Sequence, residues 1–302
     1  MDYFPLFLDI KGKKVLIVGG GVIAWRKARL VAQAGPALTF VAPQLIPQMR
    51  KLAQEYNAIV KERKFRASDL NGATLVFVAV NDSKVRDNIH LLAQQKNIPV
   101  NVVDEQRLCS FIMPALVTRD PLVVAITSGG KAPVVARRVR EDLEARLPNN
   151  YGNLAKLMDE LRPLLKDKLS EQRRRHFYEK LWDSEAAELL RLGKKRQAKE
   201  LGIRLLESML KDGVAPKGMV HFVGSGEGSP DNLTLGGLRQ LHQADIILYD
   251  KLVNPQILTM ARRDATLVAV GKPPHSQEQI NRMMVKYVEQ GKHLVRLKGG
   301  DP

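Results

Sequence analysis

The residues that decide the fold of the first third of the chain read VLIVGGGVIA and occupy positions 15–24. A short apolar run, Val15–Val18, leads into three glycines, and the segment up to Ala34 has the pattern of a helix that stops at Gly35. Gly19–Ala24 fits the spacing Gly-x-Gly-x-x-Ala between a strand and a helix, which is the context of a dinucleotide-binding turn. Glycines let the backbone approach a pyrophosphate, and the helix N-terminus supplies N–H donors. The alternative is a tight turn without a ligand.

An acidic residue that would bind the ribose hydroxyls usually ends the second strand of such a site. Here that strand ends in Val41-Ala42-Pro43-Gln44. The residues alone therefore leave NAD and NADP both open.

Further strands and helices alternate up to about residue 113. The apolar runs Leu38–Val41, Ala73–Val80 and Val100–Val103 have the composition of buried strands, and Lys84–Gln95 reads as a helix. This alternation predicts an α/β fold whose N-terminal domain, residues 1–113, is a Rossmann-type parallel sheet.

The middle region, residues 114–213, has a different pattern. A strand at Leu122–Ile126 precedes the glycine-rich loop Thr127–Lys131 and a helix that begins near Pro133. From Tyr151 to about Lys211 the chain is helical, with an apolar stripe and no evident chemistry. We expect an α+β and helical region that serves packing or dimerisation rather than catalysis.

Strand patterns return in the last part, residues 216–302. The runs Met219–Val223, Ile246–Tyr249, Leu267–Val270 and His293–Leu297 predict a partial α/β domain after a linker at 212–216. The sequence stops in a loop directly after a strand, and we expect this domain to be cut short.

Composition limits the possible partners. The 302 residues are 44% hydrophobic and 26% charged, as in globular proteins. No apolar run approaches the ~20 residues of a membrane helix, and the start of the chain lacks the pattern of a signal peptide. Cys109 is the single cysteine, and the histidines show no ligand spacing with it. These features predict a cytoplasmic protein without a disulfide, a zinc site or a membrane partner.

The net charge of +16 suggests an anionic partner. Nucleic acid, an anionic membrane surface and a polyanionic small substrate are the three candidates, and a merely solvated basic face is the plain alternative. No nucleic-acid motif or aromatic-interleaved basic patch is present, so we expect no nucleic-acid partner.

The motifs together resemble a known family. The N-terminal matches are Gly19-Gly20-Gly21, Ala24, Arg26-Lys27-Ala28, Leu30, Gly35, Val41-Ala42-Pro43, Asn101-Val102-Val103-Asp104, Ser110-Phe111-Ile112-Met113-Pro114, Ser128-Gly129-Gly130 and Pro133. With the helical segment to Lys211, they resemble siroheme synthases and their single-domain relatives, the precorrin-2 dehydrogenase/sirohydrochlorin ferrochelatases.

The C-terminal part resembles the uroporphyrinogen-III methyltransferase module of the same trifunctional family. The matching residues are Gly224, Gly226, Gly228, Leu233-Thr234-Leu235, Tyr249-Asp250, Gly271-Lys272 and Gly299-Gly300-Asp301-Pro302. The sequence departs from the family at Glu227, which replaces a proline beside the cofactor, and at Ser229, which replaces an aspartate. The stretch after Lys272 is also shorter.

The resemblance implies NAD-dependent oxidation of precorrin-2 to sirohydrochlorin, followed by insertion of Fe²⁺ to give siroheme. The implied NAD contacts are Gly19, Gly20, Gly21, Val22, Ile23, Pro43 and Gln44. The implied catalytic residue for both steps is Asp104, since both steps remove protons from one macrocycle. Taken without the resemblance, Asp104 reads as a helix N-cap or a turn residue.

The same resemblance implies an anionic tetrapyrrole as substrate, which gives the basic charge a use. Candidate contacts are Ser128, Lys131, Arg137 and Arg138, and the serine matches a phosphorylation site of the family. Ser128 also reads as a turn or capping serine, and each basic residue as a solvated or interface residue.

For the methyltransferase part, the resemblance implies Asp250 as proton acceptor and Lys272 as proton donor. It implies that Glu227, Gly299, Gly300 and Asp301 border S-adenosylmethionine. Because of the departures and the short C-terminal part, we expect that this chain does not methylate uroporphyrinogen III.

We therefore expect a cytoplasmic homodimeric enzyme of siroheme biosynthesis. The alternatives are another Rossmann oxidoreductase and a non-catalytic protein that binds tetrapyrrole or nucleic acid.

Overall fold

The computed structural model describes residues 2–211, 218–271 and 276–299. The chain divides into two compact units, residues 1–148 and 149–302, and each is considered by itself. The predicted linker at 212–216 lies outside the described residues.

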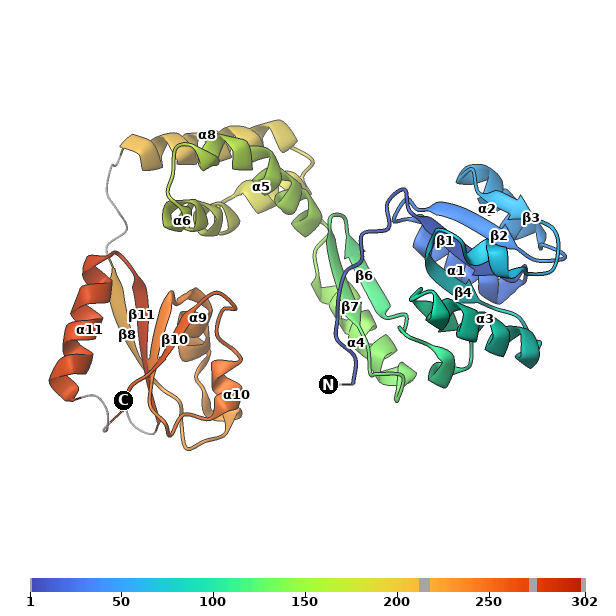
Figure 1. The fold of residues 1–302 in the computed structure, drawn as a ribbon. Coiled ribbons are helices and arrows are strands. Elements are labelled where there is room, and N and C mark those ends of the chain that lie inside the picture. The colour runs from blue at the N-terminus through green and yellow to red at the C-terminus, as the bar shows by residue number, and fades with distance from the viewer. Residues whose placement is uncertain (1, 212–217, 272–275, 300–302) are drawn as a thin grey trace. The chain divides into compact units, whose positions relative to one another are not determined.

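The first unit contains a five-stranded sheet in which all strands are parallel, in the order β3-β2-β1-β4-β5 (Figure 1). Its elements are β1 (Lys14–Val18), α1 (Val22–Ala32), β2 (Ala37–Val41), α2 (Pro47–Glu55), β3 (Ile59–Lys61), the 3-10 helix η1 (Ala67–Leu70), β4 (Ala73–Val78), α3 (Ser83–Gln95), β5 (Val100–Val102) and the 3-10 helix η2 (Gln106–Leu108). This confirms the predicted Rossmann-type sheet, while α2 and β3 were not predicted.

Strand side chains alternate between two apolar cores, one on each face of this sheet. Val15 and Ile17 pack with α1 and α2 on one face. Leu16 and Val18 pack with α3 on the other face. Helices therefore cover both faces, and the loops at the carboxyl ends of the strands are left for a ligand.

Asp69 in η1 is a completely buried carboxylate. Arg63 donates to both of its oxygens, at 2.8 and 2.7 Å, and Lys61 donates to one of them at 2.9 Å. The Arg66 backbone N–H adds a fourth bond at 2.9 Å. The hydrogen bonds from Arg63 are the main reason that the pKa of Asp69 lies far below its usual range, and they outweigh the opposing effect of burial.

After the parallel sheet, the first unit continues into an antiparallel hairpin and a helix. The hairpin pairs β6 (Ala115–Arg119) with β7 (Leu122–Ile126), and α4 (Pro133–Arg146) follows. Pro133 stands in the first turn of α4, as predicted.

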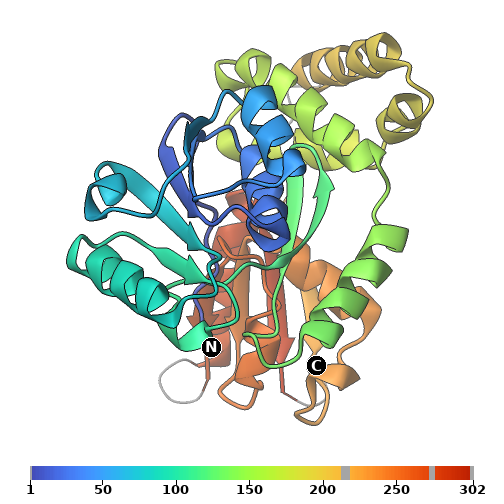
Figure 2. The same ribbon diagram turned by 90° about the vertical axis from the view of Figure 1, so that its right-hand side faces the viewer.

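The second unit opens with four helices: α5 (Asn150–Lys166), α6 (Glu171–Trp182), α7 (Ala186–Arg191) and α8 (Lys195–Lys211). Figure 2 shows them, drawn from yellow-green to ochre, as one group. The apolar stripe of α5 is buried here, since Leu154, Leu157, Leu161 and Leu165 pack with Phe177 and residues of α7 and α8. The stripe therefore builds an internal core within the predicted helical region.

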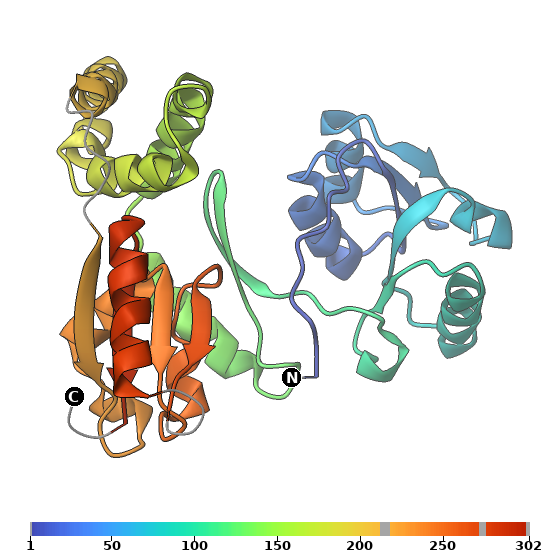
Figure 3. The ribbon, with the colours of Figure 1, turned by 60° about the vertical axis from the view of Figure 1, so that its left-hand side comes forward.

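A parallel four-stranded sheet in the order β10-β9-β11-β8 follows. Its elements are β8 (Met219–Gly224), the 3-10 helix η3 (Pro230–Asn232), α9 (Leu235–Gln243), β9 (Ile246–Tyr249), α10 (Pro255–Leu258), β10 (Thr266–Ala269), α11 (Gln277–Glu289) and β11 (His293–Lys298). The apolar cores that contain α9 and α11 lie on opposite faces of this sheet (Figure 1), and Figure 3 shows α11, in red, along one face. The predicted second α/β region is thus present as a parallel sheet.

Among the residues that the structure describes, no helix has both the length and the apolar character needed to cross a membrane.

The buried Asp69 leads to a stability prediction. Replacing Asp69 with asparagine leaves Lys61 and Arg63 without a counter-charge, and we expect a loss of about 3 kcal/mol in the free energy of unfolding at pH 7. Because the pKa of Asp69 is depressed in the folded state, its stabilising effect is present above the ordinary carboxyl pKa of about 4 and is lost as the pH falls. Urea unfolding from pH 7 downward measures both effects.

The control is Asp87→Asn, on the exposed side of α3, which should change stability by less than about 0.5 kcal/mol. An Asp69→Asn variant as stable as the parent at pH 7 would contradict the prediction.

Candidate functional site

The sheet order reverses at β1, whose neighbours are β2 and β4. In open α/β sheets, ligands bind at such a point, outside the carboxyl ends of the strands. Gly19, Gly20 and Gly21 follow β1 at this position. The structure therefore places the predicted nucleotide-binding turn at the point of the sheet where folds of this class bind their ligands.

Two of these glycines are required by the fold itself. Gly19 has φ +130°, and a Cβ there would lie 2.3 Å from the Ala79 carbonyl oxygen. A Cβ on Gly20 would lie 1.9 Å from the Gln44 carbonyl oxygen. Because Gly19 and Gly20 have no side chain, the ends of β1, β2 and β4 can come together.

Gly21 is different, because a Cβ on it would meet no atom within 4 Å. It is the N-cap residue of α1, and no side chain caps that end of the helix. Val22 and Ile23 in the first turn are exposed, as are Pro43 and Gln44 after β2. Open space, a free helix N-terminus and exposed flanking residues fit the pyrophosphate of a dinucleotide.

Asp104 follows β5 at the same edge of the sheet, and its side chain is exposed. Its φ is +59°, the left-handed conformation that few residues other than glycine adopt. The next short helix, η2, has Glu105 as its N-cap residue, so Asp104 is a turn residue and not a helix cap. A strained backbone at an exposed carboxylate is a feature that favours a functional role.

The side chains of Cys109 and Asn101 form hydrogen bonds that stabilise the backbone around the Asp104 turn. The Cys109 Sγ atom accepts from the Val102 backbone N–H at 3.1 Å and lies 3.1 Å from the Val102 carbonyl oxygen and 3.4 Å from that of Glu105. Asn101 donates to the Phe111 carbonyl at 3.0 Å. Burial raises the pKa of the Cys109 thiol, which favours its role as a neutral packing group.

Lys27 on α1 is a cation near the Asp104 turn for which the sequence predicted no role. Burial lowers its pKa, while the nearby Cys109 and Asp104 act in the opposite direction. A half-buried lysine therefore lies within electrostatic reach of Asp104.

The Ser128 loop is joined to the Asp104 turn. Ser128 accepts a bond from the Ala132 backbone N–H at 3.0 Å, and since no side chain caps α4, whose N-cap residue is Ala132, this is a bond within the loop and Ser128 is a turn serine and not a helix cap. Gln106, two residues after Asp104, donates to the Gly129 carbonyl at 3.0 Å. The two segments, far apart in the sequence, are thus in direct contact within the first unit.

The predicted basic contacts lie on or near α4. Lys131 pairs with Asp2 at 2.7 Å, and both side chains are exposed. Arg137 and Arg138 are exposed and have only longer contacts, 3.8 and 3.4 Å, with Glu141. These three cations are accessible to an anionic ligand.

At the carboxyl edge of the second sheet, Asp250 follows β9 and is bound by Arg296 of β11 at 2.5 Å. Arg296 is only 6% exposed, and it also donates to the Leu248 and Leu297 carbonyls, at 3.2 and 3.0 Å. Sequence reasoning missed this arginine, although a charged residue in the centre of an apolar strand was a visible signal.

The other predicted residues of this sheet are only partly described. Glu227 is exposed in the loop after β8, and a Cβ on Gly299 would lie 2.8 Å from the Leu252 Cβ. The predicted residues Lys272, Gly300 and Asp301 lie outside the described residues. The described side chains therefore do not complete a cofactor site.

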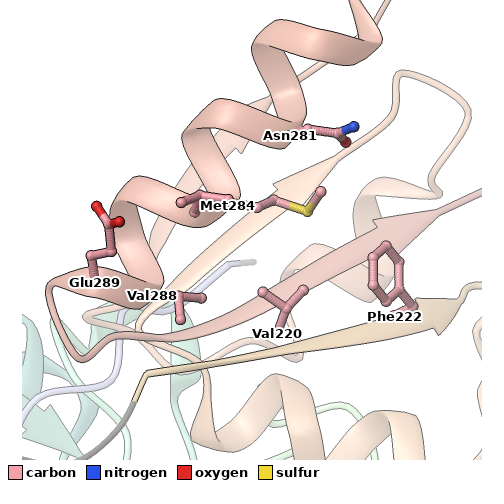
Figure 4. Close-up of a pocket in the computed structure, with 7 residues that line it drawn as sticks. Val220, Phe222, Asn281, Met284, Val288 and Glu289 are labelled. Atoms are coloured by element: carbon pink, nitrogen blue, oxygen red, sulfur yellow. The ribbon is translucent and has the colours of Figure 1, made fainter.

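An apolar groove of about 400 Å³ lies between α11 and the edge strand β8. Figure 4 shows Val220 and Phe222 of the strand opposite Met284 and Val288 of the helix. None of the predicted site residues lines it.

Comparison with known families divides the chain into four matches. Residues 6–115 match a family described as "Putative NAD(P)-binding", and residues 119–146 match the sirohaem biosynthesis protein central family. Residues 150–209 match the sirohaem synthase dimerisation region, and residues 219–302 match the tetrapyrrole (corrin/porphyrin) methylases. The fold and these matches define a Rossmann-type NAD(P)-binding protein joined to a tetrapyrrole methylase region.

Individual relatives agree with this class. The chain is 45% identical over 309 residues to the siroheme synthase of Pseudomonas paraeruginosa (strain DSM 24068 / PA7), and equally to that of Azotobacter vinelandii (strain DJ / ATCC BAA-1303). Each match covers 100% of this chain and 66% of the relative. The structure of SirC, a precorrin-2 dehydrogenase, is 27% identical with a TM-score of 0.55, and the match covers 67% of this chain and 100% of SirC. The chain belongs to the siroheme synthase family and spans about 66% of the length of these curated relatives.

The different environments of the glycines lead to a prediction on cofactor binding. Gly21→Leu should fold, since a Cβ at this position meets no protein atom within 4 Å, but the leucine should occupy the space of the pyrophosphate. We expect NAD affinity to fall by about a hundredfold, or about 2.7 kcal/mol. Fluorescence titration with NAD, together with a thermal melt, measures both properties.

Gly20→Ala is the matched contrast. Its Cβ would collide with the Gln44 carbonyl, so this variant should lose stability. Unchanged NAD affinity in a folded Gly21→Leu protein would show that the turn is not the binding site.

Proposed function

We propose that this protein acts in siroheme biosynthesis, where it oxidises precorrin-2 to sirohydrochlorin with NAD and then inserts Fe²⁺ to give siroheme. The observation that carries this proposal is the placement of Asp104. This exposed carboxylate, in a left-handed turn, lies at the same sheet edge as the open glycine turn at Gly21. Membership of the siroheme synthase family and the similarity to SirC support it.

The chemistry requires a group that takes up protons. Oxidation of precorrin-2 removes one hydride and one proton from the macrocycle. Bound NAD would accept the hydride, and Asp104 would accept the proton. Insertion of Fe²⁺, which is a substrate here, displaces two further protons from ring nitrogens, and the same carboxylate can pass them to solvent.

The cations around the Ser128 loop fit an anionic tetrapyrrole. Lys131, Arg137 and Arg138 are exposed and close in sequence to the loop that contacts Gln106. A guanidinium group binds a carboxylate through charge-assisted hydrogen bonds. A phosphate on Ser128 would add negative charge beside these cations and weaken substrate binding.

We infer further that the C-terminal region is part of an S-adenosylmethionine-dependent uroporphyrinogen-III C-methyltransferase. Asp250 and Lys272 would move protons, and Glu227, Gly299, Gly300 and Asp301 would border the cofactor. Arg296 holds Asp250 in place at the strand edge. Lys272, Gly300 and Asp301 lie outside the described residues.

We also propose a cytoplasmic homodimer, with no nucleic-acid partner. The match of residues 150–209 to a dimerisation region supports the dimer. Exposed apolar side chains, Val134 and Val135 on α4, Leu164 on α5 and Leu192 directly after α7, would be covered by a second copy.

The role of Asp104 is tested by Asp104→Asn. Asparagine tolerates the left-handed conformation, so the turn should keep its shape while the proton acceptor is lost. We expect precorrin-2 oxidation and Fe²⁺ insertion both to fall by about 10²–10⁴-fold, with NAD affinity unchanged. Sirohydrochlorin absorbance follows both reactions. Rates near those of the parent would mean that Asp104 has only a structural role.

The oligomeric state is tested by sedimentation equilibrium. We expect a dimer at micromolar concentration, since the helices of both units expose large apolar side chains. Sedimentation as a monomer at these concentrations would count against the dimer.

If nucleic acid were the true partner, binding to it would weaken steeply with salt and would not respond to NAD.

A further inference from the structure

The Gln106 side chain connects three separate segments of the first unit. Its Nε2 atom donates to the Gly129 carbonyl at 3.0 Å and to the Tyr3 hydroxyl at 3.1 Å. Gln106 itself opens η2, two residues after Asp104. One amide group therefore ties the N-terminal segment and the glycine-rich loop to the turn that carries the exposed carboxylate.

The two glycines after Ser128 form the socket for this amide. Gly129 and Gly130 have φ values of +67° and +81°, which favour glycine. A Cβ on Gly130 would lie 2.6 Å from both Gln106 amide atoms, Nε2 and Oε1. Only a glycine at position 130 lets the amide lie this close. The contact with Gln106 therefore explains why the Ser128-Gly129-Gly130 motif ends in a glycine.

The other end of the connection is the strained turn. Asp104 is in the left-handed conformation, and the Cys109 thiol bonds to the backbone of Val102 and Glu105 on either side of it. Between Asp104 and Gln106 there is one residue. A movement of Gln106 would therefore also move the backbone of Asp104.

We propose that Gln106 is a positioning residue that fixes the spacing between Asp104 and the Ser128 loop. This inference rests on the proposed function, in which Asp104 takes up protons and the Ser128 loop contacts the carboxylates of the same macrocycle. A rigid tetrapyrrole that contacts both segments needs them at a constant separation, and misplacement by about 1 Å can cost a hundredfold in rate. Gln106 supplies that constraint through its bond to Gly129.

The test compares Gln106→Ala and Gln106→Met with the parent. Methionine keeps the length of the side chain but cannot donate to Gly129. The control is Gln95→Ala at the exposed C-terminal end of α3. For each protein, kcat and KM are measured with precorrin-2 and NAD, together with the rate of Fe²⁺ insertion, NAD affinity and the thermal midpoint.

We expect both Gln106 variants to fold and to bind NAD as the parent does. Their kcat should fall by about tenfold or more in both reactions, while Gln95→Ala remains unchanged. In an Asp104→Asn background, Gln106→Ala should cause no further loss, because its effect passes through Asp104. A residue with only a structural role would not show this dependence.

A parent-like kcat in folded Gln106→Met would overturn the inference. A raised KM with unchanged kcat would also overturn it, since Gln106 would then contribute to substrate binding. If Asp104→Asn loses activity while the Gln106 variants do not, the inference fails and the proposed function stands. If the parent does not oxidise precorrin-2, both fall.

Discussion

The close approach of backbone atoms around Gly19 and Gly20 is the constraint on which the first unit depends. The ends of β1, β2 and β4 meet there so tightly that a Cβ on Gly19 would lie 2.3 Å from the Ala79 carbonyl oxygen, and a Cβ on Gly20 would lie 1.9 Å from that of Gln44. This contact fixes where α1 begins and leaves Gly21 beside open space. The glycines thus have two separable roles, since two of them close the strand ends and the third leaves room for a ligand.

Asp104 depends on the same edge of the sheet but is held by different forces. The Val103 N–H bonds to the Val78 carbonyl at 2.9 Å and joins the end of β5 to β4. The Cys109 thiol bonds to the backbone of Val102, and the Gln106 amide, two residues after Asp104, bonds to the Gly129 carbonyl, so both restrain the turn. The left-handed conformation of Asp104 costs about 1–3 kcal/mol. Several weak bonds from the surrounding residues offset this cost and keep the exposed residue in place.

Much of this arrangement was predictable from the sequence, because buried parallel strands are continuous apolar runs and glycine turns have a fixed spacing. β3 escaped prediction because Ile59–Lys61 is three residues long and largely exposed. Arg296 and Gln106 escaped it because their partners, Asp250 and Gly129, are distant in the sequence. A local pattern can mark a residue such as Arg296 as unusual, but it does not say which distant residue is its partner, because only the tertiary fold brings the two together.

The use of the basic residues could not be predicted from the sequence either. The net charge does not tell whether a cluster such as Arg173–Arg175 or the pair Arg137 and Arg138 is free to bind a ligand. The cluster Arg173–Arg175 is largely bonded within the second unit. Arg173 donates to the Met209 carbonyl, and Arg174 donates to the carbonyls of Lys166, the last residue of α5, and Leu169 in the loop after it. Arg175 pairs with the buried Asp245 at 2.5 Å. Arg137 and Arg138, by contrast, are 61% and 73% exposed, with only loose contacts to Glu141. Because a bound guanidinium would have to break its internal bonds before it could bind a ligand, the accessible pair on α4 is the stronger candidate for contact with an anionic macrocycle.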